Sequence, residues 1–145
     1  MVDLKVFLGG TCNESNWRER LIPKLTINYF NPVVSDWNEK AQEEEIKQRE
    51  TCDYCLYVIS PKMTGVYSIA EVIDDANKRP EKTVFCVLES DTSEDGKSLS
   101  FSQGQLKSLN QVGKLVQQNG GIWLPTLNDV AEYLNSSCDG SCSGN

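Results

Sequence analysis

The chain has 145 residues, of which 39% are hydrophobic and 24% charged, so it can fold as one domain with its own core and is too apolar to be disordered. Its formal net charge of −7 argues against nucleic acid or a membrane surface as the main partner, whereas a small nucleotide needs only local hydrogen-bond donors. No apolar run could span a bilayer, and the first residues read as a strand rather than a secretory leader, so we expect a cytoplasmic protein.

The first half of the chain predicts strands alternating with helices. Two short apolar runs are typical of strands, and each ends at a turn signal, Gly9-Gly10 after the first and Asn31-Pro32 after the second. A highly charged segment that follows predicts an exposed helix, which could also form an oligomer contact. These elements are strands at 4–8 and 26–30 and helices at about 15–24 and 39–51.

The second half continues the alternation and ends in a polar tail. Its predicted elements are strands at 55–59, 83–88 and 122–124 and helices at 68–78, 103–118 and about 126–134. The polar segment 89–102 is expected to be mobile. Residues 136–145 are rich in Ser, Gly and Cys and are expected to form a flexible tail, which leaves residues 1–135 as the single folded domain.

Strands that read as near-continuous apolar runs between helices predict a parallel sheet covered on both faces. The five units fit a flavodoxin-like three-layer α/β sandwich with a five-stranded parallel sheet of order 2-1-3-4-5. The ligand crevice of such a sheet lies at the carboxyl ends of strands one and three, where the order reverses. The loops at 9–16 and 60–68 should therefore form the site.

The cysteines and the lack of histidine limit the available chemistry. Without a leader sequence, we expect reduced thiols, with Cys86 in the core. Cys52 and Cys55 could alternatively join Cys138 and Cys142 in a four-thiolate zinc site. The chain has no histidine, which removes serine–histidine and cysteine–histidine nucleophiles, so acid–base chemistry must come from carboxylates, Tyr, Lys or Cys.

Glu71 is the central candidate residue, and it has two interpretations. Ser68-Ile69-Ala70-Glu71 is a capping-box pattern, in which the hydroxyl and the carboxylate satisfy the first amides of a helix. Alternatively, Glu71 faces the crevice as a nucleophile, because a carboxylate near a helix start can attack an anomeric carbon and form a covalent glycosyl-enzyme.

Other polar and aromatic residues near the two loops are candidate substrate contacts. The Gly9-Gly10-Thr11 turn could bring backbone amides to a phosphate or a ribose, or could be only a turn. After the second strand, Asp36 could hold a sugar hydroxyl and Trp37 could stack on a base, or the segment could be a turn with its Trp folded onto the domain.

Five further residues are assigned to structural roles or left between two roles. We expect Trp17 in the core, and Arg18 either binding an anion or solvated. Asp53 precedes the third strand and should lie at the end of the sheet opposite the crevice. Asp74 and Asp75 are expected on a solvated face of their helix.

The path from Val6-Phe7-Leu8-Gly9-Gly10 to Gly65-Val66-Tyr67-Ser68-Ile69-Ala70-Glu71 resembles the nucleoside 2-deoxyribosyltransferase superfamily, and most closely its divergent deoxyribosyltransferase-like branch. The resemblance covers most of residues 2–88. It implies that Glu71 attacks C1′ of a nucleoside or nucleotide, the base leaves, and another base or water takes the sugar. It further implies that no metal or cofactor is needed and that the protein forms a homo-oligomer.

The resemblance also suggests a set of site residues and one departure from the family. Where the family has a tyrosine that hydrogen-bonds the nucleophile, this chain has Phe7, and Tyr67 could substitute for it. This departure favours the alternative of a non-catalytic nucleotide-binding or sensing module, and a TIR-like interaction domain of the same architecture is a further alternative. The substrate-binding residues expected beside Glu71 are Phe7, Gly9, Gly10, Thr11, Asn31, Asp36, Trp37, Tyr67 and Ser68.

Overall fold

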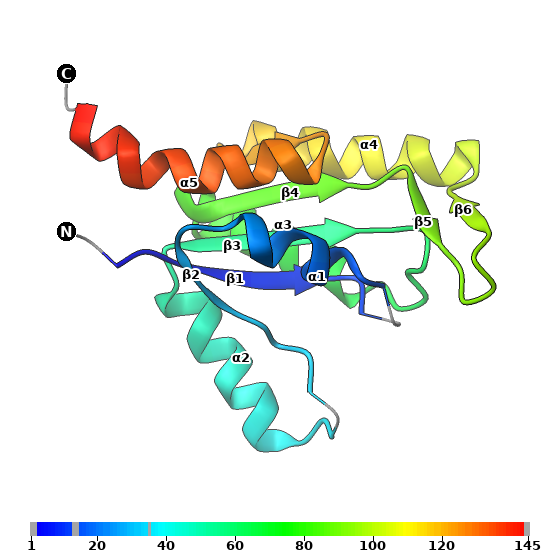
Figure 1. The fold of residues 1–145 in the computed structure, drawn as a ribbon, viewed down its shortest axis with the longest axis horizontal. Coiled ribbons are helices and arrows are strands. Elements are labelled where there is room, and N and C mark those ends of the chain that lie inside the picture. Colours follow the sequence, from blue (N-terminus) through cyan, green and yellow to red (C-terminus); the bar gives the residue numbers. More distant parts are fainter. Residues whose placement is uncertain (1–2, 13–14, 35, 144–145) are drawn as a thin grey trace.

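A computed structural model describes residues 3–12, 15–34 and 36–143 of the chain, with side chains as far as Ser136. Its centre is a five-stranded, wholly parallel sheet of order β2-β1-β3-β4-β7 (Figure 1). The strands of this sheet are β1 (Lys5–Gly10), β2 (Asn28–Phe30), β3 (Tyr54–Ile59), β4 (Thr83–Val87) and β7 (Ile122–Leu124).

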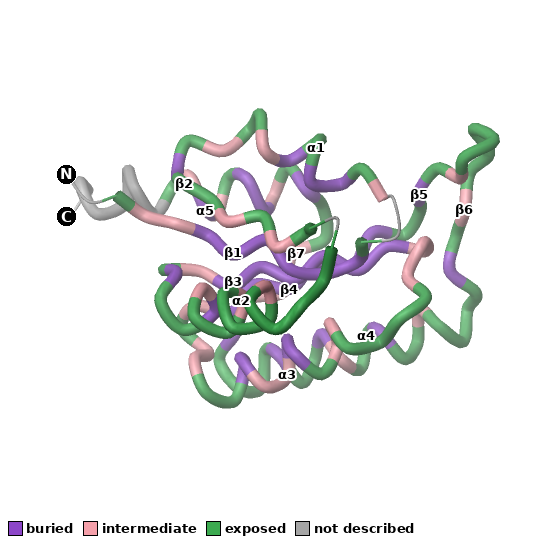
Figure 2. Tube along the Cα trace, turned by 90° about the horizontal axis from the view of Figure 1, so that it is seen from below, coloured by how far each residue is buried: buried purple, intermediate pink, exposed green. Residues whose placement is uncertain are grey.

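Helices cover both faces of the sheet, and the buried strands form the middle layer (Figure 2). Alternate residues of a strand point to opposite faces, so Val6 and Leu8 of β1 join one core cluster and Phe7 joins the other. The first cluster includes side chains of α1 and α5, and the second those of α3 and α4. The helices are α1 (Trp17–Leu21), α2 (Glu39–Thr51), α3 (Tyr67–Lys78), α4 (Gln103–Gln118) and α5 (Leu127–Ser143).

The structure adds elements that the sequence did not predict. The segment expected to be mobile carries an antiparallel pair, β5 (Ser90–Thr92) and β6 (Ser98–Ser100), which is why the last strand of the main sheet is β7. Helix α5 runs to Ser143, so its predicted end at Leu134 is wrong, whereas the flexibility of 136–145 stays a prediction. None of the described helices is both long and apolar enough to cross a membrane.

The start of α3 rules out the capping-box interpretation of Glu71. The residue that precedes α3 is Val66, and no side chain caps the helix, because Ser68 already lies inside its first turn. A capping box needs its hydroxyl residue just outside the helix. α4 has this arrangement, with Ser102 accepting from the Gln105 amide at 3.1 Å while the Gln105 side chain bonds back to the Ser102 amide.

The carboxyl end of β1 requires glycine, and it fixes the chain that leads into the site. Gly10 has φ = +119°, and a Cβ on it would lie 2.0 Å from the Val58 carbonyl oxygen of β3. The next amide, that of Thr11, donates to this same oxygen at 2.9 Å. The backbone of β1 therefore stays against β3 up to the first residue of the loop.

We expect Gly113→Ala in α4 to destabilise the protein by about 1–3 kcal/mol through overpacking. A Cβ there would lie 2.4 Å from the Trp123 ring, which belongs to β7 and cannot move without disturbing the sheet edge. Gly104→Ala is the matched control, because its nearest neighbour is the Ser102 Oγ at 4.0 Å. In urea unfolding, this control should gain up to about 1 kcal/mol from helix propensity, and equal effects of the two variants would contradict the packing argument.

Candidate active site

A cavity of about 240 Å³ opens at the carboxyl ends of the central strands, beside the point where the strand order reverses. Its walls come from the end of β1, the segment that leads into α2, and side chains of α1, α2 and the first two turns of α3. Trp37 and Tyr67 are 54% and 68% exposed, so both rings lie at the solvent-facing side of this cavity.

Glu71 is the enclosed carboxylate of this cavity, with its side chain 8% exposed. Its Oε2 is buried and has no hydrogen-bond partner among the described residues. Burial, a hydrogen bond with Glu45 and repulsion by Glu45 and Asp75 raise the pKa of Glu71 to about 8, although the charge of Arg49 acts in the opposite direction. The protonated form of the side chain is therefore favoured in the free protein below about pH 8.

Glu45 is the second carboxylate in the same cavity. It projects from α2, is half-buried and interacts directly with Glu71. Two carboxyl groups can hydrogen-bond to each other only when a proton lies between them, and the raised pKa of Glu71 supplies that proton. A pair of this kind can supply a charged nucleophile and a proton donor at once, provided that the proton resides on the partner of the attacking group.

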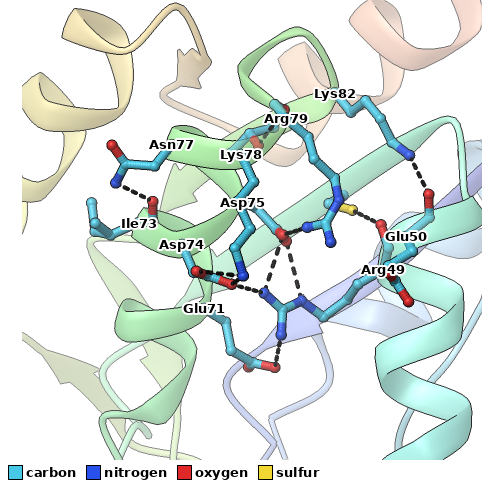
Figure 3. A network of polar contacts seen from close by, with 12 residues as sticks. Arg49, Glu50, Glu71, Ile73, Asp74, Asp75, Asn77, Lys78, Arg79 and Lys82 are labelled. Atoms are coloured by element: carbon cyan, nitrogen blue, oxygen red, sulfur yellow. Dashed lines mark hydrogen bonds and ion pairs between the residues drawn. The ribbon is translucent and has the colours of Figure 1, made fainter.

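Arg49 connects this pair to a buried polar network between α2 and α3 (Figure 3). Its Nη1 lies 3.6 Å from Glu71 Oε2, and its Nη2 lies 3.0 Å from an Asp74 oxygen. The Nε and Nη2 atoms donate to the two oxygens of Asp75 at 3.3 and 3.1 Å. The side chain of Asp75 is completely buried. The sequence prediction of a solvated face is therefore wrong for Asp75, while Asp74 remains partly exposed.

The part of the chain that forms this cavity matches a known family. Residues 3–90, more than half of the chain, match the sequence profile of the family described as Nucleoside 2-deoxyribosyltransferase like. The chain belongs to this family. The matched range contains every residue that lines the cavity, and the resemblance inferred from the sequence is thereby confirmed. No curated protein and no solved structure matches the chain.

This nucleoside 2-deoxyribosyltransferase-like domain brings most of the predicted site residues together. The predicted residues that line the cavity are Phe7, Gly9, Gly10, Trp37, Tyr67, Ser68 and Glu71. They come from segments far apart in the sequence, and the parallel sheet places them at one edge. Their contact with a substrate stays a prediction.

Three of the predicted substrate contacts lie elsewhere. Thr11 is buried, and its Oγ1 accepts from the Ser60 amide at 3.0 Å, so it holds the two loops together behind the cavity wall. Asn31 accepts from the Val33 amide at 3.1 Å and lines a neighbouring cavity. Asp36 is exposed and is not among the described residues that line the site.

The predictions of structural roles are confirmed for two residues and differ from the structure for a third. Trp17 lies in the core as predicted. Asp53 accepts from the Lys5 amide at 2.9 Å, which places it at the amino end of β1, opposite the cavity as predicted. Arg18 is buried rather than solvated, and its guanidinium donates to the carbonyl oxygens of Leu8 and Thr11 at 2.8–3.0 Å.

The cysteines show no sign of metal binding or disulfides within the described part of the chain. Cys12, Cys52, Cys55 and Cys86 are free, and no group of three metal-ligating side chains occurs among the described residues. Burial raises the pKa of Cys55 and of Cys86 to about 12, so neither thiol ionises readily. The side chains of Cys138 and Cys142 lie outside the described residues.

A larger cavity of about 790 Å³ lies between α1 and the start of α5. The carboxylates on its walls, Glu19 and Glu89, are exposed. It therefore offers no enclosed carboxylate of the kind that Glu71 provides, and the smaller cavity is the better candidate for chemistry.

Proposed function

We propose that this protein cleaves or exchanges the N-glycosidic bond of a nucleoside or nucleotide, with Glu71 as the nucleophile. The observation that carries the proposal is the enclosed Glu71 carboxyl, whose Oε2 has no hydrogen-bond partner among the described residues and which interacts with Glu45 in the same cavity. Membership of the nucleoside 2-deoxyribosyltransferase-like family supports the class of reaction.

The two carboxyls favour a double displacement over direct attack by water. An inverting mechanism needs its carboxyls about 6.5–9.5 Å apart so that a water molecule fits between them and the sugar. Glu45 and Glu71 line one small cavity and interact directly, which does not leave that separation between them. A carboxylate that attacks the sugar directly needs no such gap.

The proposed reaction has two steps. An ionised Glu71 oxygen forms a bond to C1′ while the bond from C1′ to the base breaks, and Glu45 gives its proton to the departing base. In the second step, water or another base attacks C1′, Glu45 takes the proton of the attacking group, and the bond to Glu71 breaks to restore its carboxylate. Both steps use the single proton that the carboxyl pair holds in the free protein.

The remaining walls suit a nucleoside. Trp37 and Tyr67 present exposed aromatic rings on which a base can stack. Gly9 and Gly10 contribute the end of β1 to the same cavity wall as Glu71, so a sugar bound there would lie beside the backbone of β1. The substrate panel described next identifies which base, sugar and 5′ group the protein accepts.

The test measures, by chromatography, the release of free base from a panel of deoxynucleosides, ribonucleosides and their 5′-monophosphates. Each reaction is run with and without an added acceptor base. We expect release from at least one deoxynucleoside or deoxynucleotide. The Glu71→Gln protein, purified identically, excludes a contaminating hydrolase. Saturable binding of a nucleotide without any base release would instead identify a sensing module and overturn the catalytic proposal.

A further inference from the structure

Arg49 is the only buried residue of α2 and has an unusual division of its hydrogen-bond donors. One edge of its guanidinium, Nε and Nη2, is bonded to both oxygens of Asp75. This bidentate contact fixes the plane of the group. The remaining nitrogen, Nη1, is directed at Glu71 Oε2 (Figure 3).

The partner that orients Arg49 is itself held firmly. Asp75 is completely buried, and it accepts hydrogen bonds from the Tyr57 hydroxyl of β3 and from the Arg79 guanidinium. Asp75 and Glu71 are four residues apart on α3, so they lie on the same helix face, one turn apart. The position of Nη1 relative to Glu71 is therefore set by groups that cannot easily move.

We propose that Arg49 is a positioning residue for Glu71, whose side-chain charge and fixed orientation favour the charged form of the attacking carboxylate and fix its place in the cavity wall. This inference rests on the proposed function. It concerns a residue that does not itself line the cavity and acts only through Glu71, which does.

The separation of 3.6 Å between Nη1 and Oε2 suits this role. It is longer than a hydrogen bond, so Arg49 does not tie up the lone pairs of the buried Oε2. It is short enough for the positive charge to favour the ionised carboxylate. Phe7, the β1 side chain that lines the same cavity, has no polar atom with which to do this.

The other charged groups near Glu71 do not replace Arg49. Glu45 of α2 and Asp75 of α3 carry negative charge and disfavour an ionised Glu71. Asp74 accepts from Arg49 and Lys78. Arg18 of α1 lines the cavity, but its donors are directed to backbone carbonyls. Of the described residues, Arg49 is the cation that pairs with Glu71.

A purely structural role for Arg49 is the competing explanation, since the side chain also joins α2 to α3. Arg79→Gln is the matched control, because Arg79 bonds to the same Asp75 without pairing with Glu71. A structural role predicts that Arg49→Gln and Arg79→Gln both lower stability and leave the titration of Glu71 alone. A positioning role predicts that only Arg49→Gln changes that titration.

The experiment records the carboxyl carbon signals of the Glu-labelled protein by NMR as a function of pH, with Glu71 assigned from the Glu71→Gln spectrum. Because an opposite charge within ~4–6 Å lowers a carboxyl pKa by about 1–3 units, we expect Arg49→Gln to raise the pKa of Glu71 by about 1 unit or more. Arg79→Gln should leave it unchanged. In the pH–rate profile, Arg49→Gln should lower kcat at neutral pH and recover part of it in alkaline buffer, with little change in KM.

Arg49→Lys tests orientation separately from charge, and it also serves if Arg49→Gln does not fold. Lys keeps the positive charge and loses the bidentate fork. We expect kcat to fall on the order of 10-fold or more, because small misplacements of a reacting group are costly, while the pKa of Glu71 stays near its wild-type value.

The outcomes separate this inference from the proposed function. An unchanged Glu71 titration in Arg49→Gln, or wild-type kcat in Arg49→Lys, overturns the role of Arg49 while base release by the wild-type protein still stands. Absence of base release by the wild-type protein, together with a raised pKa of Glu71 in Arg49→Gln, defeats the proposed function and leaves the electrostatic coupling between Arg49 and Glu71 established.

Discussion

Replacing Glu71 with Gln should abolish base release, with a loss in kcat on the order of 10⁴–10⁶-fold, the range seen when a covalent nucleophile is removed. The amide has nearly the same shape but cannot form the glycosyl ester. Asp74→Asn is the matched control, because Asp74 is on the same helix and also binds Arg49, yet it is partly exposed and outside the cavity lining. Retained turnover by Glu71→Gln would falsify the nucleophile assignment.

The covalent intermediate can be observed directly. A 2′-fluoro-arabinosyl nucleoside slows both displacement steps, because the fluorine destabilises the positive charge that develops at C1′. Intact-mass measurement should then show one sugar bound to the wild-type protein, and peptide mapping should locate it on Glu71. The Glu71→Gln protein should gain no mass under the same conditions.

Glu71→Gln should also make the folded protein more stable than the wild type in alkaline solution. The pKa of Glu71 is raised to about 8 in the folded protein, whereas an unfolded glutamate ionises near 4.5. Between these pH values, the folded state binds more protons than the unfolded state, so the wild-type protein loses stability as pH rises. Gln mimics the protonated form at every pH. We therefore expect equal melting temperatures at pH 4–5 and a higher one for Glu71→Gln at pH 8–9.

The sheet and the location of the site could be predicted because both follow from local patterns. Short apolar runs identified each strand of the main sheet, and a parallel sheet places the loops after β1 and β3 at one edge. The hairpin of β5 and β6 was missed because Ser, Asp and Thr dominate its strands, and their pairing depends on the opposite strand rather than on apolar spacing.

The acid–base partner and the positioning residue could not be predicted from the sequence. Glu45 and Arg49 lie in a helix where nearly every residue is charged or polar, and its pattern shows no apolar face to orient it. Their four-residue spacing places both on one side of α2, but the side that meets α3 is set by tertiary packing. The burial of Asp75 has the same origin, since it depends on Tyr57, Arg49 and Arg79 converging from different elements.

Replacing Glu45 with Gln should have the second largest effect, and its size should depend on the base that leaves. Loss of a general acid typically costs about 10²–10⁴-fold, so we expect a decrease of this size for ordinary deoxynucleosides. 7-Methyl-2′-deoxyguanosine carries a base that is already cationic and departs without receiving a proton. The first step for this substrate should be nearly as fast in Glu45→Gln as in the wild-type protein.

This pattern distinguishes a proton donor from a residue that only shapes the cavity. Loss of a residue that only shapes the cavity would lower the rate of base release from both substrates equally. Glu71→Gln should lose activity on both substrates, because the nucleophile is needed whatever base departs. Glu43→Gln, on the same helix but exposed and outside the cavity lining, is the matched control and should behave as the wild type. Equal loss on the two substrates would exclude Glu45 as the acid.

The titration of Glu71 in the Glu45→Gln protein provides a check that needs no turnover. Glu45 contributes both a hydrogen bond and a negative charge to the raised pKa of Glu71, so its replacement should move that pKa down from about 8 toward the ordinary value. Glu71 would then be ionised at neutral pH without a proton held beside it. The variant should attack the methylated substrate at lower pH than the wild type does, while ordinary substrates, which need the proton, should gain nothing from the change.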